Sequence, residues 1–206
     1  LNSREEDKSP KNKKLKIKDW RRGEVIKDYR FYIISLNMLA MPWLATGIFV
    51  YQSFISDSKM WNIYTIPKAF MVYSVTSILT LFLSGFLVDK FTGRKLIYVM
   101  NIPLLSALLI LFGYNHEVVA YIFLGLVGVS NGLANILGSS TWAEIYGVKF
   151  IGSIKALTTA FMVFSTAFGT AIFGLLIDYS FTIEDIALVG AIYIIVSLVL
   201  LLLIKE

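Results

Sequence analysis

The chain alternates long uncharged apolar runs with short polar links, and this pattern predicts membrane-spanning helices. Residues 69–88 and 96–114 contain no charged residue, and each run approaches the roughly 20 residues that a helix needs to cross a bilayer. Similar runs recur along the chain and predict six spans, at about 31–55, 67–89, 95–114, 118–141, 153–177 and 186–204. The expected fold class is therefore all-α, a polytopic membrane helix bundle with six transmembrane helices.

The composition agrees with a membrane protein and argues against several other classes. Of the 206 residues, 57% are hydrophobic and 16% are charged, which is too apolar for a soluble domain of this size. There is no cysteine and only one histidine, His116, so we expect no disulfide, no thiol chemistry and no metal site. We find no zinc-protease motif, no paired intramembrane aspartates and no phosphate-binding glycine loop, so we expect neither enzyme activity nor a cofactor.

Positive charge is concentrated at the start of the chain, where residues 1–30 carry the whole net charge of +5. We interpret 1–30 as a basic tail with a short amphipathic helix beside the membrane from about Asp19, and 31–206 as the transmembrane domain. A nucleic-acid-binding arm is the alternative, but attraction to anionic membrane lipid is favoured here. With both termini cytoplasmic, every basic residue except Lys59 and Lys68 faces the cytoplasm, as the positive-inside rule requires.

The link between the second and third spans carries a motif in addition to this topology signal. It has glycines, an aspartate and a basic pair in the pattern Gly85-x-Leu87-x-Asp89 followed by Gly93-Arg94-Lys95. Glycine lets membrane helices approach closely, and the aspartate has basic partners within reach. The alternative is a solvated basic turn that only fixes topology. The pattern resembles the signature loop of the major facilitator superfamily (MFS) of secondary transporters, which usually has two residues between the aspartate and the glycine where this chain has three.

A second segment, after the fourth span, adds to the resemblance. It combines an aromatic residue, an acid, glycines and a lysine in the pattern Trp142-Ala-Glu144-Ile-Tyr-Gly147 followed by Gly152-x-Ile-Lys155. This segment resembles the inner link of C-terminal MFS halves, in the bacterial branch similar to monocarboxylate and oxalate–formate carriers. The resemblance covers most of the chain and implies the C-terminal six-helix half of an MFS transporter. It also implies an N-terminal half in the same or another chain, and a place in the bacterial inner (plasma) membrane.

The resemblance implies alternating access, with the first, second, fourth and fifth helices lining a central cavity and the third and sixth facing outward. Polar residues of the spans and their ends are the candidates for the substrate cavity: Asn131, Asn135, Gln52, Thr46, Tyr73, Trp142 and Ser165. Asn131 and Asn135 are four residues apart and share one helix face. The alternative is that these amides only join helices.

Charged residues at the ends of spans two, three and four are the candidates for a cytoplasmic gate: Asp89, Arg94, Lys95 and Glu144. Their signs are complementary, so we expect Asp89, Arg94 and Glu144 to form one charge cluster.

The predicted function is secondary active transport of a small solute, and the family branch implies a small organic anion such as a monocarboxylate. The polar stripes contain no arginine or lysine, so we expect the cation for an anion to come from the other half. The family also implies a coupled proton or ion, but no acidic or basic residue lies deep in a span. Two alternatives remain: a non-transporting membrane scaffold or assembly subunit, and a half-size carrier that acts as a homodimer.

Overall fold

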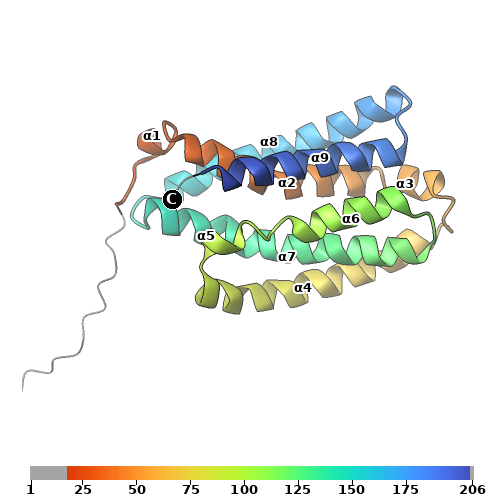
Figure 1. Ribbon diagram of the computed structural model, residues 1–206, viewed down its shortest axis with the longest axis horizontal. Helices are drawn as coiled ribbons and strands as arrows, with labels where there is room; N and C mark the ends of the chain where they lie inside the picture. Colours follow the sequence, from red (N-terminus) through yellow and green to blue (C-terminus); the bar gives the residue numbers. More distant parts are fainter. Residues whose placement is uncertain (1–17, 205–206) are drawn as a thin grey trace, which may run out of the picture.

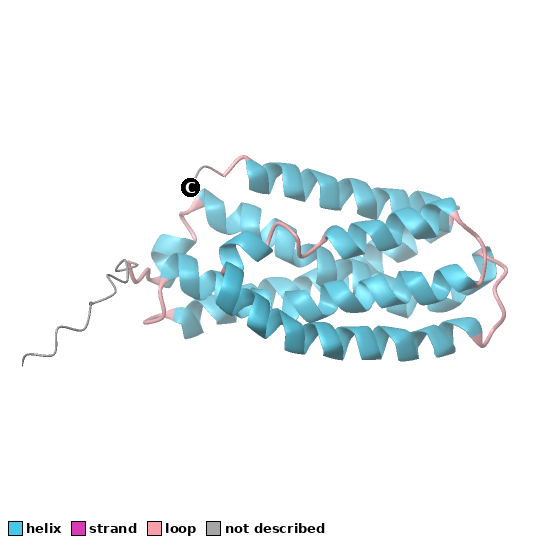
Figure 2. Cartoon of the chain, turned by 60° about the horizontal axis from the view of Figure 1, so that its bottom comes forward, coloured by secondary structure: helices cyan, strands magenta, loops and turns pink. Residues whose placement is uncertain are grey.

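The computed structural model describes residues 18–204, and every regular element in that range is a helix (Figure 2). In chain order the helices are α1 (Arg22–Val25), α2 (Tyr29–Val50), α3 (Gln52–Ser58), α4 (Thr65–Phe91), α5 (Gly93–Leu96), α6 (Ile102–Gly113), α7 (Val118–Tyr146), α8 (Ile151–Asp178) and α9 (Ile183–Leu202). Most of the predicted basic tail lies outside the described residues. The helix expected from about Asp19 is the four-residue α1.

Two groups of helices pack side by side, with α2, α8 and α9 in one and α4, α6 and α7 in the other (Figure 1). The groups meet mainly where α6 packs against α9, with further contacts between α2 and α7. In the most apolar stretches of α2 and α7, 61% and 56% of the residues are buried, against 6% in α4 and 17% in α8. Helices α2 and α7 are therefore central, and α4 and α8 form outer walls.

Five helices, α2, α4, α7, α8 and α9, are long and apolar enough to cross a membrane, and α6 is a shorter apolar helix. Their lengths and compositions are those of a multi-pass membrane protein. Apart from Asp185 in its first turn, the exposed side chains of α9 are apolar, which suits contact with lipid: Leu188, Val189, Ile192, Ile195, Val196, Val199 and Leu202.

The third predicted span is not one continuous helix, which corrects the prediction for 95–114. Helix α5 ends at Leu96, a turn covers residues 97–101, and α6 then continues along α7 (Figure 1). Pro103 stands in the first turn of α6, where its missing N–H removes no helical hydrogen bond.

Side chains from two neighbouring helices satisfy the backbone at this break. Asn37 of α2 donates through Nδ2 to the carbonyl oxygen of Ile97 at 3.2 Å, and Asn101 donates through Nδ2 to the carbonyl oxygen of Asn37 at 2.6 Å. Ser130 of α7 donates through Oγ to the carbonyl oxygen of Met100 at 2.8 Å. All three polar side chains are fully buried. Because an unpaired backbone group in an apolar interior is costly, these bonds permit the break.

Two other boundaries differ from the prediction. The first span, expected at 31–55, is helical only to Val50 and resumes one residue later as α3. Helix α7 runs past its predicted end, so Trp142 and Glu144 are helical and do not lie in a link. The helix stops at Gly147, whose φ of 81° is a conformation that favours glycine.

Helix α4 approaches the backbone of α7 because α7 presents glycines to it. A Cβ atom added to Gly132 would lie 2.7 Å from the carbonyl oxygen of Ser77, closer than real Cβ atoms approach. Thr76 donates through Oγ1 to the carbonyl oxygen of Gly125 at 2.9 Å. Small residues and hydroxyl bonds of this kind are typical of membrane helix pairs, and they fix α4 as one wall of the site described next.

Candidate functional site

A cavity of about 450 Å³ lies between α2, α4, α7 and α8. This volume falls in the range of small-molecule sites. On α2 the lining runs from Ser35 to Phe49, and α4 contributes Tyr73. On α7 it runs from Asn131 to Trp142 and on α8 from Lys155 to Met162, so it uses the second half of α7 and the first turns of α8. Those segments meet at the end of the bundle that also holds residue 18 and the C-terminal end of α9 (Figure 1). We call this the N-terminal end, and the opposite end the far end.

Most of the predicted cavity residues line this space: Asn131, Asn135, Thr46, Tyr73 and Trp142. Asn135 is exposed and donates through Nδ2 to the carbonyl oxygen of Asn131 at 2.9 Å. Asn131 donates through Nδ2 to Oγ of Ser77 on α4 at 2.9 Å. Asn131 therefore joins two helices and lines the cavity at once, whereas the side chain of Asn135 is bonded only within its own helix.

Aromatic side chains form part of the cavity wall. Trp142 is 1% exposed and stacks on Tyr146, with ring centroids 5.8 Å apart. Toward the far end, Tyr73 packs edge-on against Phe49, with centroids 5.2 Å apart, and both line the cavity. These rings give the site a largely apolar frame around its few polar groups.

Two predicted cavity residues lie outside the lining. Gln52 stands in the first turn of α3, beyond the end of α2. Ser165 is 7% exposed and donates through Oγ to the carbonyl oxygen of Leu39 at 3.3 Å, so it joins α8 to α2. Gln52 lies outside because α2 ends at Val50, and Ser165 lies outside because it is on the face of α8 that packs against α2.

Lys155 lines the cavity from the second turn of α8, which corrects the expectation that no arginine or lysine stands among the cavity residues of this half. Its side chain is exposed and forms no ion pair within residues 18–204. Thr158 and Met162 line the cavity from the same helix, three and seven residues further on, so all three share a face. Ser35 of α2 also lines it, and its buried Oγ has no hydrogen-bond partner among the described residues. The cavity thus combines a cation, a free hydroxyl and the amide of Asn135.

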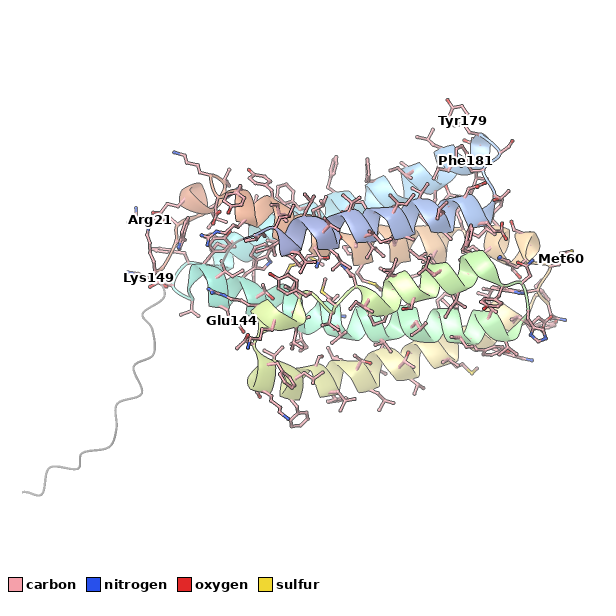
Figure 3. All side chains as sticks on the ribbon, in the orientation of Figure 1. Arg21, Met60, Glu144, Lys149, Tyr179 and Phe181 are labelled. Carbon is pink, nitrogen blue, oxygen red and sulfur yellow. The ribbon has the colours of Figure 1, made fainter. Side chains whose placement is uncertain are left out.

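At the N-terminal end, Glu144 of α7 holds α5 in place (Figure 3). Its Oε1 accepts from the backbone N–H of Gly93 at 2.7 Å, and its Oε2 from the backbone N–H of Arg94 at 3.0 Å. Arg94 donates in return through Nη2 to the carbonyl oxygen of Glu144 at 2.6 Å. A Cβ atom on Gly93 would lie 2.9 Å from Oγ of Ser140 and 3.1 Å from the backbone nitrogen of Thr141, so glycine favours this approach. The carboxylate occupies the start of a helix, where the backbone dipole favours negative charge.

The predicted charge cluster at this end is only partly present. Asp89 and Lys95 are exposed, and neither side chain makes an ion pair or hydrogen bond in the part of the chain that the structure describes. The reason is that α4 continues to Phe91, so Asp89 is held on the helix surface and not in the link. Thr92 then turns the chain, with a φ of 69° that β-branched residues rarely adopt.

A buried lysine joins three segments at the far end. Lys59 follows α3, its side chain is fully buried, and its Nζ donates to Oε1 of Glu184 on α9 at 2.6 Å and to Oδ1 of Asn115 at 2.7 Å. Trp61 donates through Nε1 to the carbonyl oxygen of Asn115 at 2.6 Å. The α6–α7 link, the start of α9 and the segment after α3 are therefore bound together.

Helices α2 and α8 also pack closely toward the far end. Phe173 of α8 contacts Trp43 and Tyr51 on the α2 side, with ring centroids 6.3 Å and 6.1 Å away. Gly169 faces the backbone of Trp43, where a larger residue has no room. Together with the Lys59 bonds, these contacts hold the helices together toward the far end.

No group of three or more histidine, cysteine, aspartate or glutamate side chains within residues 18–204 is arranged to hold a metal ion. No protein-family model and no curated protein matches this chain.

Proposed function

We propose that the chain is one six-helix half of a facilitator-type secondary transporter for a small organic anion. The observation that carries the proposal is the cavity, which Lys155, Ser35 and Asn135 line together. A carboxylate is bound well by a cation together with neutral hydrogen-bond donors. The glycine, aspartate and arginine pattern of residues 85–95 supports the same family.

The position of Lys155 suits an entrance site. A charged side chain is costly at the centre of a bilayer but is tolerated near a helix end, where a long side chain reaches water. Lys155 lies one turn inside α8, and Asn131 lies deeper along the cavity wall. On this proposal the lysine attracts the anion and the polar residues further inside orient it.

The proposal includes a second six-helix half, in the same or another chain, that covers the outer walls. Helices α4 and α8 bury little of their surface in this bundle. Ala160, Ala167 and Ala171 are exposed on α8, and small residues let a partner helix approach closely. Two halves that rock about a shared cavity give alternating access. The proposed N-terminal end faces the cytoplasm, in accordance with the positive-inside rule.

The test is uptake of radiolabelled formate, oxalate and lactate into liposomes that contain the purified chain. We expect uptake of at least one anion, and we expect Lys155→Gln to reduce it about tenfold, as the loss of a charge-assisted hydrogen bond would. Lys149→Gln is the matched control, because Lys149 is exposed in the α7–α8 link and does not line the cavity. It should leave uptake unchanged.

Asn135→Leu separates a binding role from a structural one. If Asn135 binds solute, the variant folds in detergent and loses uptake per folded molecule. If uptake is retained and thermal stability falls, Asn135 is structural. Folded protein that takes up no anion contradicts transport by a homodimer of this chain, and the second half must then come from another six-helix segment or the chain is a scaffold.

A further inference from the structure

A second and smaller space lies at the N-terminal end, separate from the cavity, and it has no part in the proposed solute transport. It measures about 90 Å³ and is bounded by the start of α2, α5 with the turn after it, the end of α7 and the end of α9. Two arginines, Arg30 and Arg94, line it, together with Thr141 and Tyr98. This volume is well below that of a site for a whole small molecule, so it suits one polar group of a larger ligand.

Thr141 gives the first sign that a ligand belongs there. Its residue is fully buried, yet its Oγ1 has no hydrogen-bond partner among the described residues. A buried hydroxyl without a partner is unfavourable, and native proteins leave few of them. A ligand oxygen in this space would accept the hydrogen bond.

The two arginines that line the space differ in their hydrogen-bond partners. Arg30 is bound to Asp28, through Nε at 3.1 Å and through Nη2 at 3.0 Å. Burial opposes ionisation of Asp28, but the hydrogen bonds from Arg30 outweigh it and lower the pKa of Asp28, so this pair stays charged. Arg94 donates only to the neutral backbone carbonyl of Glu144, whose carboxylate is occupied by backbone N–H groups. The guanidinium of Arg94 therefore has no carboxylate partner among residues 18–204.

The rest of the lining is apolar and continues onto the outer surface of the bundle. Leu201 and Ile204 line the space at the end of α9. The neighbouring Leu202 and Leu203 are 71% and 70% exposed. If the headgroup of an anionic lipid occupied the space, its acyl chains would lie along the exposed apolar face of α9. Basic pockets between membrane helices are suited to anionic lipid headgroups.

We propose that this space binds the phosphate of an anionic phospholipid, with Arg94 and Thr141 as its ligands and the acyl chains lying along α9. The ligand chemistry is that of a phosphate oxyanion. Arg94 supplies charge and donors, Thr141 supplies the donor that is otherwise unused, and Arg30 lines the same space with its own charge paired to Asp28. Because the site joins α5, α7 and α9, bound lipid would stabilise the break between α5 and α6.

Native mass spectrometry of the full chain in detergent, titrated with phosphatidylglycerol, tests the proposal. We expect one tightly bound lipid, about tenfold weaker binding in Arg94→Gln, and a smaller loss in Thr141→Val. Phosphatidylcholine should bind no more weakly to these variants than to the wild type. Arg22→Gln, at an exposed position of α1, is the matched control and should bind phosphatidylglycerol as the wild type does.

Thr141→Val also guards against a folding artefact. It replaces an unpaired hydroxyl with a methyl group of similar size, so the lipid-free variant should be as heat-stable as the wild type or more so. Inorganic phosphate tests whether the ligand is a free anion or a lipid headgroup. If millimolar phosphate displaces the lipid, a free anion binds to the same residues. If the lipid stays bound, the lipid headgroup is the ligand. Equal binding of phosphatidylglycerol by wild type, Arg94→Gln and Thr141→Val would overturn the site, as would no binding by any of them.

Discussion

Lys59 at the far end and Lys155 at the N-terminal end carry the same charge but differ in what their side chains contact. Lys59 is fully buried and bonds to Glu184 and Asn115. Lys155 is exposed along the cavity and has no ion-pair partner in the described part of the chain. The ammonium group of Lys59 donates its hydrogen bonds to other segments of the bundle. The ammonium group of Lys155 remains available to bind a ligand. Under the proposed function, this difference separates a structural end of the bundle from a binding end.

The largest expected effect follows from breaking the far end. Lys59→Met should lower the free energy of unfolding by about 1.5–3 kcal/mol, because it removes hydrogen bonds to a charged group and leaves Glu184 unpaired. Lys155→Met is the matched comparison and should change stability by less than about 0.5 kcal/mol. Unfolding in mixed micelles, followed by circular dichroism, measures both. Equal losses in the two variants would remove the distinction between the ends.

At the N-terminal end, Glu144 and Asp89 form a second matched pair. Glu144→Gln should cost about 1 kcal/mol, because it removes the negative charge from the start of α5 and weakens two backbone bonds. Asp89→Asn should cost less than about 0.5 kcal/mol, since this exposed carboxylate has no partner among the described residues. Faster amide hydrogen exchange at residues 93–96 in Glu144→Gln alone would support the account. A larger loss in Asp89→Asn would contradict it.

The smallest expected effect concerns Thr92, in the link between α4 and α5. Thr92 has a φ of 69°, a conformation that is strained for a β-branched residue and free of strain for glycine. Thr92→Gly should therefore raise the free energy of unfolding by about 0.5–1 kcal/mol, after the extra entropy of glycine in the unfolded chain is subtracted. Thr92→Ala is the control and should bring a smaller gain. Destabilisation by glycine would show that the hydroxyl or methyl group of Thr92 makes a contact that matters more than the strain.

The long helices were predictable because uncharged length alone determines whether a segment can span a bilayer. The break at residues 97–101 was not predictable from the local sequence. It depends on Asn37 and Ser130, which come from other helices and satisfy the freed carbonyl groups. The local sequence contained Asn101 and Pro103, but neither residue by itself distinguishes a broken helix from a kinked one.

The candidate site was predictable where helical spacing placed residues on one face. Asn131 and Asn135 were assigned to the cavity from their separation by four residues, and both line it. The same reasoning reaches Lys155 if the face of Thr158 and Met162 is extended three residues toward the start of α8. Lys155 was instead counted with the basic residues of the link, because topology and binding use the same residue type. Ser165 was expected in the cavity but lies outside it for a different reason. Its partner is a carbonyl group of α2, which no sequence pattern reveals.

The central claim is that the space between α2, α4, α7 and α8 is a water-accessible anion site, and cysteine labelling tests it most directly. Gly138 lines the cavity and has room for a side chain, and the natural chain contains no cysteine. Gly152 has similar room in the first turn of α8 but lies outside the lining, so Gly152→Cys is the control. The account predicts that a polar thiol reagent labels both variants, and that formate, oxalate or lactate slows labelling of Gly138→Cys alone. A Gly138→Cys variant that stays unlabelled, or that is labelled at the same rate with and without each anion, would contradict it.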